Sequence, residues 1–126
     1  MRHHRRMRRA ILALVLLGSA VAAPAASAGG PLYFRSPSGN ILCTIIPYSQ
    51  TGCAVVSVRG AANVSYRGRA RQVRYAPANV RRSVLGYNRY YRYGGFRCDS
   101  TTAGMRCRSL ATGHGFHVSR SELDLF

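Results

Sequence analysis

The chain has 126 residues, of which 19 are basic and only three are acidic, and because every basic one is arginine its formal net charge is +16. So few carboxylates leave little for the acid–base chemistry of glycosidases and proteases. A chain this basic is expected to bind polyanions, without specific recognition of a nucleic-acid sequence.

The first 28 residues have the pattern of a cleaved signal peptide. Met1–Arg9 is basic, Ala10–Leu17 is apolar, and Ala26–Ala28 is an A-x-A cleavage pattern. We expect export by a Sec-type pathway, with the twin-arginine pathway as the alternative that the arginine pairs leave open. The mature chain is then a single small β domain over residues 29–126, secreted or held in the cell envelope. It has no transmembrane segment, because no remaining apolar run approaches the ~20 residues that a span needs.

The first part of the mature chain predicts a β-hairpin. A turn is expected at Ser36–Asn40, which contains proline and glycine. Ile41–Ile46 is apolar and typical of a buried strand, and Cys53–Val58 is a second strand. A disulfide between Cys43 and Cys53 would join these two strands.

The middle of the chain, residues 59–85, has the weakest pattern. Val64–Tyr66 and Gln72–Tyr75 are candidate short strands, and Pro77–Leu85 predicts one or two helical turns. Tyrosines are then interleaved with arginines up to Tyr93, as on faces that bind single-stranded nucleic acid or sugar. We expect these rings instead to supply apolar bulk to a small sheet without tryptophan.

The closing hairpin is the best-specified element. Its residues alternate at strand period, and the register that sets Cys98 opposite Cys107 closes around the four-residue loop Thr101–Gly104. In this register Asp99 faces Arg106, which makes a complementary pair.

The same register sets Arg97 opposite Arg108. Two like charges in this position cost stability unless an anion or a carboxylate lies between them. We expect the outer face of the hairpin, together with Arg92, to be an anion contact. The alternative is internal neutralisation by Glu122 or Asp124.

Four cysteines in a small chain predicted to be exported indicate two disulfides. Of the three possible connectivities, Cys43–Cys53 with Cys98–Cys107 fits the two hairpins. Metal binding is the competing role, but neither pair has the C-x2-C spacing of common zinc sites. We therefore predict no metal and no cofactor.

His114 and His117 are the histidines of the mature chain and the one candidate for catalysis. With nearby arginines they would form the acid–base pair of a nuclease-like hydrolase. On a regular strand, however, positions 114 and 117 point to opposite faces, and the glycines around His114 favour a structural role. No carboxylates are expected near them to complete a metal site. We assign no catalytic residue and expect a protein that is not an enzyme.

Several motifs together resemble an uncharacterised family. They are Ser36-Pro37-Ser38-Gly39-Asn40-Ile41 followed by Cys43, and Thr112-Gly113-His114-Gly115-Phe116 followed by Ser119-Arg120. The family consists of small exported bacterial proteins, found mostly in actinobacteria. The resemblance covers Phe34–Cys53 and Leu85–Phe126, and it implies an exported, disulfide-linked, mainly β domain with no known activity.

These patterns predict a mainly β fold, which is a small antiparallel sheet, sandwich or partial barrel, stapled by disulfides, built from hairpins and holding at most one short helix. We expect a monomeric binding or structural protein that contacts anionic polymers of the envelope or an extracellular protein. The alternatives are the nuclease-like hydrolase and a protein inhibitor or effector.

Overall fold

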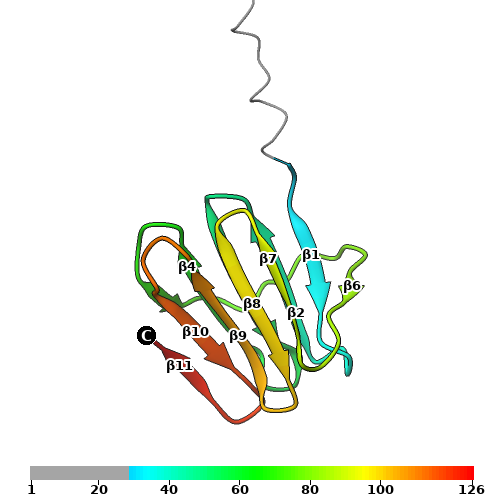
Figure 1. Ribbon diagram of the computed structural model, residues 1–126. Coiled ribbons are helices and arrows are strands. Elements are labelled where there is room, and N and C mark those ends of the chain that lie inside the picture. The colour runs from blue at the N-terminus through cyan, green and yellow to red at the C-terminus, as the bar shows by residue number, and fades with distance from the viewer. Residues whose placement is uncertain (1–28) are drawn as a thin grey trace, which may run out of the picture.

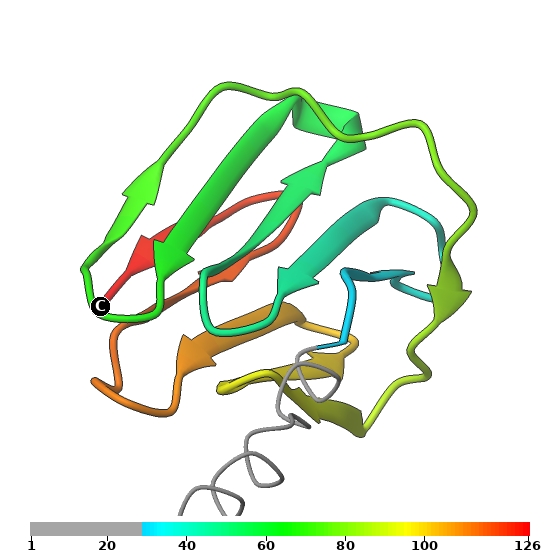
Figure 2. The same ribbon diagram turned by 90° about the horizontal axis from the view of Figure 1, so that it is seen from above.

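The computed structural model describes residues 29–126, which form two β-sheets packed face to face (Figures 1 and 2). This confirms the mainly β fold class, and of the three predicted forms the structure has the sandwich. The helical part of the described residues is one 3-10 turn, η1 (Val56–Val58). Within residues 29–126, no helix is long and apolar enough to cross a membrane. The predicted signal peptide, residues 1–28, lies outside the described residues.

Sheet A contains six strands in the spatial order β5-β4-β3-β2-β1-β6. The first five form an antiparallel meander: β1 (Leu32–Arg35), β2 (Ile41–Ile46), β3 (Gln50–Val55), β4 (Gly60–Ser65) and β5 (Ala70–Gln72). The sixth strand, β6 (Ser83–Val84), lies at the other edge and runs parallel to β1.

Sheet B is an antiparallel meander of five strands in the order β11-β10-β9-β8-β7. Its strands are β7 (Arg89–Tyr93), β8 (Phe96–Thr101), β9 (Gly104–Ser109), β10 (Gly115–Val118) and β11 (Leu123–Leu125). Figure 2 shows the two layers, with the green strands of sheet A above the yellow to red strands of sheet B.

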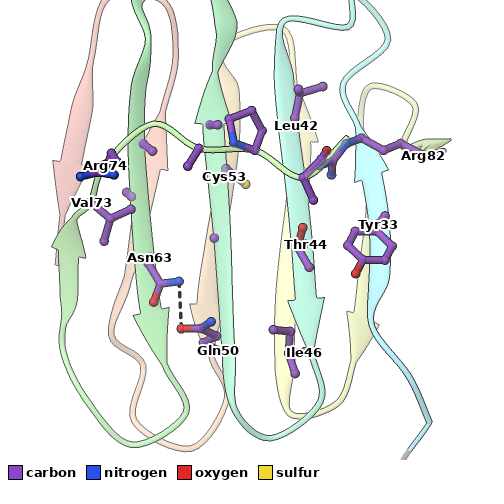
Figure 3. Close-up of a pocket in the computed structure, with 17 residues that line it drawn as sticks. Tyr33, Leu42, Thr44, Ile46, Gln50, Cys53, Asn63, Val73, Arg74 and Arg82 are labelled. Carbon is purple, nitrogen blue, oxygen red and sulfur yellow. Dashed lines mark hydrogen bonds between the residues drawn. The ribbon is translucent and has the colours of Figure 1, made fainter. Parts of the chain in front are cut away.

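The connection from β5 to β6 crosses the whole width of sheet A. These strands lie at opposite edges, five strand spacings or about 24 Å apart. Residues 73–82, which we call the strap, would reach only about 15 Å as a helix but more than about 30 Å when extended. The helix predicted at Pro77–Leu85 is therefore wrong, and the strap runs over the outer face of sheet A (Figures 2 and 3).

Both predicted disulfides are present, Cys43–Cys53 between β2 and β3 and Cys98–Cys107 between β8 and β9. Each joins two directly opposite residues of a hairpin. All four cysteines face the core, where Sγ of Cys53 lies 3.7 Å from Sγ of Cys107. The covalent links of the two sheets therefore pack against each other in the core between the sheets.

Aromatic rings fill the space around the disulfides. Phe34, Phe96 and Phe116 are completely buried. The ring of Tyr91 meets Phe34 edge-on at 5.1 Å between centroids, and the ring of Tyr66 meets Phe96 at 5.9 Å. Of the tyrosines predicted to supply apolar bulk, Tyr91 and Tyr93 pack against the core, whereas Tyr87 and Tyr90 are exposed.

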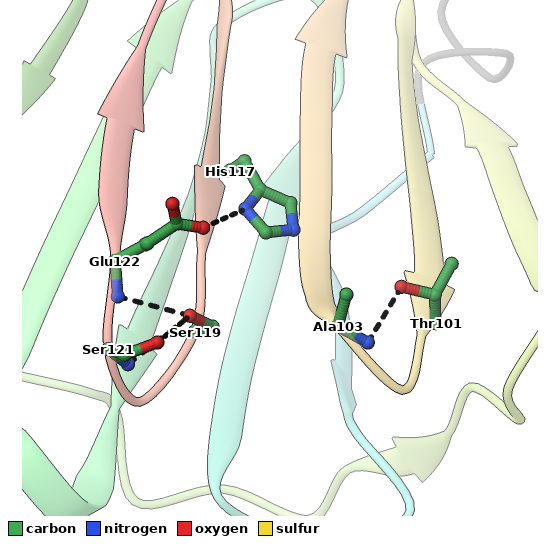
Figure 4. Close-up of polar contacts among 6 residues, drawn as sticks. All are labelled: Thr101, Ala103, His117, Ser119, Ser121 and Glu122. Carbon is green, nitrogen blue, oxygen red and sulfur yellow. Dashed lines mark hydrogen bonds and ion pairs between the residues drawn. The ribbon is translucent and has the colours of Figure 1, made fainter.

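The closing hairpin has the predicted register, with Cys98 opposite Cys107. Its loop is shorter than predicted, because Thr101 pairs with Gly104 and leaves a two-residue turn. Two-residue connections suit the twist of paired strands. Gly104 has a φ of +131° and so ends the turn in a conformation that favours glycine, while the Thr101 hydroxyl accepts a hydrogen bond from Ala103 N–H (Figure 4).

Candidate anion-binding face

Three arginines form one cross-strand row on sheet B. Arg92 of β7 lies opposite Arg97 of β8, and Arg97 lies opposite Arg108 of β9. The side chains of Cys98 and Cys107 face the core, so alternation along the strands directs these arginines to the outer face. We call Arg92, Arg97 and Arg108 the arginine row. The predicted pairing of Arg97 with Arg108 is confirmed, and the structure sets Arg92 beside them.

The middle arginine of the row is held by a carboxylate from its own strand. Nε of Arg97 donates to both carboxylate oxygens of Asp99 at 3.1 Å, and Nη2 donates to Oδ1 at 2.9 Å. These hydrogen bonds raise the pKa of the Arg97 guanidinium. The group also lies over the ring of Tyr90, with Cζ 3.9 Å from the centroid.

This arrangement corrects two expectations about the outer face. Asp99 does lie opposite Arg106, but it pairs with Arg97, and the Arg106 guanidinium lies over the Phe126 ring at 4.2 Å. The carboxylate that neutralises Arg97 is therefore Asp99, rather than Glu122 or Asp124. The prediction considered only residues that face each other across two strands. It therefore missed the contact between Arg97 and Asp99, which lie two residues apart on the same strand.

The two outer arginines of the row form no ion pair with a carboxylate in residues 29–126. Among residues 29–126, neither Arg92 nor Arg108 has a carboxylate oxygen within 4.0 Å. Neighbouring strands are about 4.8 Å apart, so the backbone positions of the three arginines span about 10 Å, with one carboxylate, Asp99, paired to the middle arginine. Such a surface favours an anion with charges repeated along its length.

Gly115 of β10 follows Arg108 in the same cross-strand row. It lies directly opposite Arg108, and a Cβ at this position would come within 2.1 Å of the Cys107 carbonyl oxygen and 2.8 Å of Arg108 Cα. Only glycine allows so close an approach of the two backbones. Because it has no side chain, nothing from this position shields Arg108.

The two histidines lie in different surroundings. His117 is on β10, and its Nδ1 is 3.9 Å from Oε1 of Glu122 (Figure 4). His114 lies in the loop before β10, where its backbone N–H donates to the Thr112 hydroxyl at 3.1 Å. Within the described residues, no hydrogen bond or ion pair joins the two imidazoles.

The structure brings carboxylates to His117 that the sequence did not predict there. One nitrogen of His117 and one oxygen each of Glu122 and Asp124 lie within 4.8 Å of one another. The expectation that no carboxylates lie near the histidines is therefore wrong. A similar group of Cys43, Cys53 and Cys107 is occupied by the disulfides.

The hollows found among residues 29–126 lie outside the arginine row, and the two larger ones are described here. One, of about 310 Å³, lies between the strap and the outer face of sheet A, with Leu42 and Ile46 in its wall and Arg74 and Arg82 from the strap (Figure 3). The other, of about 500 Å³, lies at one end of the sandwich. It is lined from both signature motifs, by Ser36, Ser38 and Asn40 and by Ser119 and Arg120.

These features define a class, which is a small β-sandwich with a disulfide in each sheet and a basic outer face on one of them. Residues 67–126, which include the whole of sheet B, match the profile of a family described as "Family of unknown function (DUF6636)". The predicted resemblance to an uncharacterised domain family is thereby confirmed for the second part of the chain. No curated protein and no solved structure matches the chain.

Proposed function

We propose that this chain is an exported binding protein that contacts anionic polymers of the cell envelope or of the extracellular space. The observation that carries the proposal is the arginine row, in which Arg92, Arg97 and Arg108 lie side by side with one neutralising carboxylate. Like charges directly opposite one another destabilise a sheet, so a bound polyanion would relieve a cost that the folded chain carries alone.

The composition supports the same proposal. Residues 29–126 hold 14 arginines and three acidic residues, so their net charge is +11. The row offers three arginine side chains on neighbouring strands, and the exposed ring of Tyr90 lies against the guanidinium of Arg97. Binding is proposed to depend on backbone charge and not on sequence or on a single functional group.

The test is a salt series with two polyanions, oligodeoxythymidine and polyglutamate. Arg92→Ala/Arg108→Ala should weaken the binding of both. For oligodeoxythymidine, the double variant should reduce the magnitude of the negative slope of log K against log salt by about 1.4. This is the loss of two phosphate contacts at about 0.7 each for a single strand. The matched control is Arg69→Ala/Arg81→Ala, which removes the same charge from exposed positions outside sheet B.

Equal weakening by the two double variants would contradict the proposed face and leave only the net charge as the cause. The same samples test the hydrolase alternative, because a nuclease would shorten the oligonucleotide during the incubation. We expect it to stay intact. Cleavage that disappears in His114→Ala/His117→Ala would replace the binding proposal with an enzymatic one.

A further inference from the structure

A second cluster of chemistry-bearing side chains lies on sheet B, at the edge away from β7. His117 of β10 and Asp124 of β11 are direct cross-strand partners, and Glu122 lies in the turn between the two strands. Figure 4 shows the Glu122 carboxylate directed from this turn toward the imidazole. One ligand atom from each residue lies within 4.8 Å of the other two.

The surrounding backbone holds His117 and Glu122 in place. The Ser119 hydroxyl accepts hydrogen bonds from the N–H groups of Ser121 at 3.2 Å and Glu122 at 3.1 Å, and Ser119 N–H donates to the Glu122 carbonyl at 2.9 Å. On the other side, a Cβ on Gly104 would lie 3.1 Å from Nε2 of His117. Nε2 of the ring therefore lies beside Gly104, and Nδ1 is directed to the Glu122 carboxylate.

The charge distribution makes this cluster unusual. The chain has three acidic residues, and one of them, Asp99, pairs with Arg97. The other two, Glu122 and Asp124, have no arginine nitrogen within 4.0 Å in residues 29–126, although this part of the chain holds 14 arginines. Arg106, the neighbour of His117 on β9, is turned to the Phe126 ring instead.

The imidazole of His117 does not form a hydrogen bond with the Glu122 carboxylate. At 3.9 Å, the distance from Nδ1 of His117 to Oε1 of Glu122 exceeds the 2.7–3.2 Å of a hydrogen bond. The His117 side chain is 20% exposed and that of Glu122 is 56% exposed, so the cluster is open to solvent on one side. Three donor atoms thus converge, from a ring packed in place and two carboxylates without an arginine partner.

We propose that His117, Glu122 and Asp124 bind a zinc ion. Zinc takes imidazole nitrogen and carboxylate oxygen at about 2.0–2.2 Å, which places tetrahedral ligand atoms about 3.4 Å apart. Rotation of the exposed Glu122 and Asp124 side chains would close the remaining distance, which is 0.5 Å between His117 and Glu122 and at most about 1.4 Å for the other two pairs. The imidazole favours zinc over magnesium or calcium, which prefer oxygen ligands alone. Three protein ligands leave the fourth position to water. The proposal is independent of the function proposed above.

The test is calorimetric titration of the oxidised full chain with zinc chloride. His3 and His4 are first replaced by alanine, because histidines near the N-terminus bind metal themselves. We expect one zinc per chain. His117→Ala, Glu122→Gln and Asp124→Asn should each weaken binding on the order of 10–100-fold or more. The matched controls are His114→Ala and Asp99→Asn, which should bind zinc like the parent.

A second readout distinguishes the site from nonspecific binding. Zinc should shift the Nδ1 resonance of His117 in an imidazole nitrogen spectrum and leave that of His114 unchanged. Absence of one-to-one binding would overturn the proposal. Parent-like zinc affinity in His117→Ala would also overturn it. So would a loss of affinity in His117→Ala with parent-like affinity in both Glu122→Gln and Asp124→Asn, since that result indicates binding by the imidazole alone.

Discussion

The two sheets resemble each other on their inner faces and differ on their outer faces. Inside, each contributes a hairpin with a disulfide between directly opposite cysteines. Outside, sheet A is covered by the strap over apolar side chains such as Leu42 and Ile46, whereas sheet B presents the arginine row.

The cause of this difference is the order of the strands. In sheet A the chain must return from β5 to β6 at the opposite edge, so its connection covers the outer face. In sheet B each strand follows its neighbour, and short turns leave the outer face free. A face without a covering segment can carry charged side chains, because they remain hydrated.

Removing the disulfides tests whether the inner faces are equivalent, and it should have the largest effect. The two cysteine pairs are separated by 10 and 9 residues in sequence, so each disulfide is expected to contribute about 2–3 kcal/mol to the free energy of unfolding. Cys43→Ala/Cys53→Ala and Cys98→Ala/Cys107→Ala should therefore destabilise the domain by similar amounts in urea denaturation. A large inequality would show that one sheet depends on its disulfide much more than the other.

Detaching the strap tests the covered face. The Arg82 guanidinium donates to the carbonyl oxygens of Cys43 and Ala78, and partial burial lowers its pKa. Because hydrogen bonds from a charged group contribute about 1.5–3 kcal/mol, Arg82→Ala should lower the free energy of unfolding by about that amount. It should also speed amide hydrogen exchange at Val73, whose N–H bonds to Ala61.

The matched control for the strap is the neighbouring exposed residue. Arg81→Ala should change the free energy of unfolding by less than about 0.5 kcal/mol, as is usual for surface substitutions. If the two variants are equally stable, Arg82 does not anchor the strap.

Freeing the middle arginine tests the open face and should have the smallest effect on stability. Asp99→Asn removes the ion pair with Arg97. The two side chains are 33% and 29% exposed, so the free energy of unfolding should fall only slightly. The same change should tighten polyanion binding, since the row then presents three unpaired charges. Weaker binding in a filter assay at fixed salt would show that Asp99 positions Arg97 for the ligand instead of competing with it.

Local patterns were sufficient for the features that depend on neighbouring strands in sequence. The alternation around Cys98 and Cys107 predicted the register of the closing hairpin, and with it the pairing of Arg97 with Arg108. The two disulfides followed from the same hairpins. The side-chain period of two leaves little freedom once one cross-strand pair is set.

The features that sequence reasoning missed depend on contacts between distant or differently oriented segments. The strap is extended because β5 and β6 lie at opposite edges, a fact of strand order that Pro77–Leu85 does not contain. Asp99 forms its ion pair with Arg97 and not with Arg106, and the Arg106 guanidinium lies over the ring of Phe126 instead.

By itself, the sequence determined the strand alternation, the two disulfide-linked hairpins and the excess of positive charge, since these follow from residue spacing and composition. The tertiary structure alone decided where that charge is exposed and which side chains meet. It set Arg92 beside Arg97, packed Cys53 against Cys107 and brought Glu122 and Asp124 to His117. The physical reason is that lateral strand order and sheet packing are set by burial of the whole core and not by any local pattern.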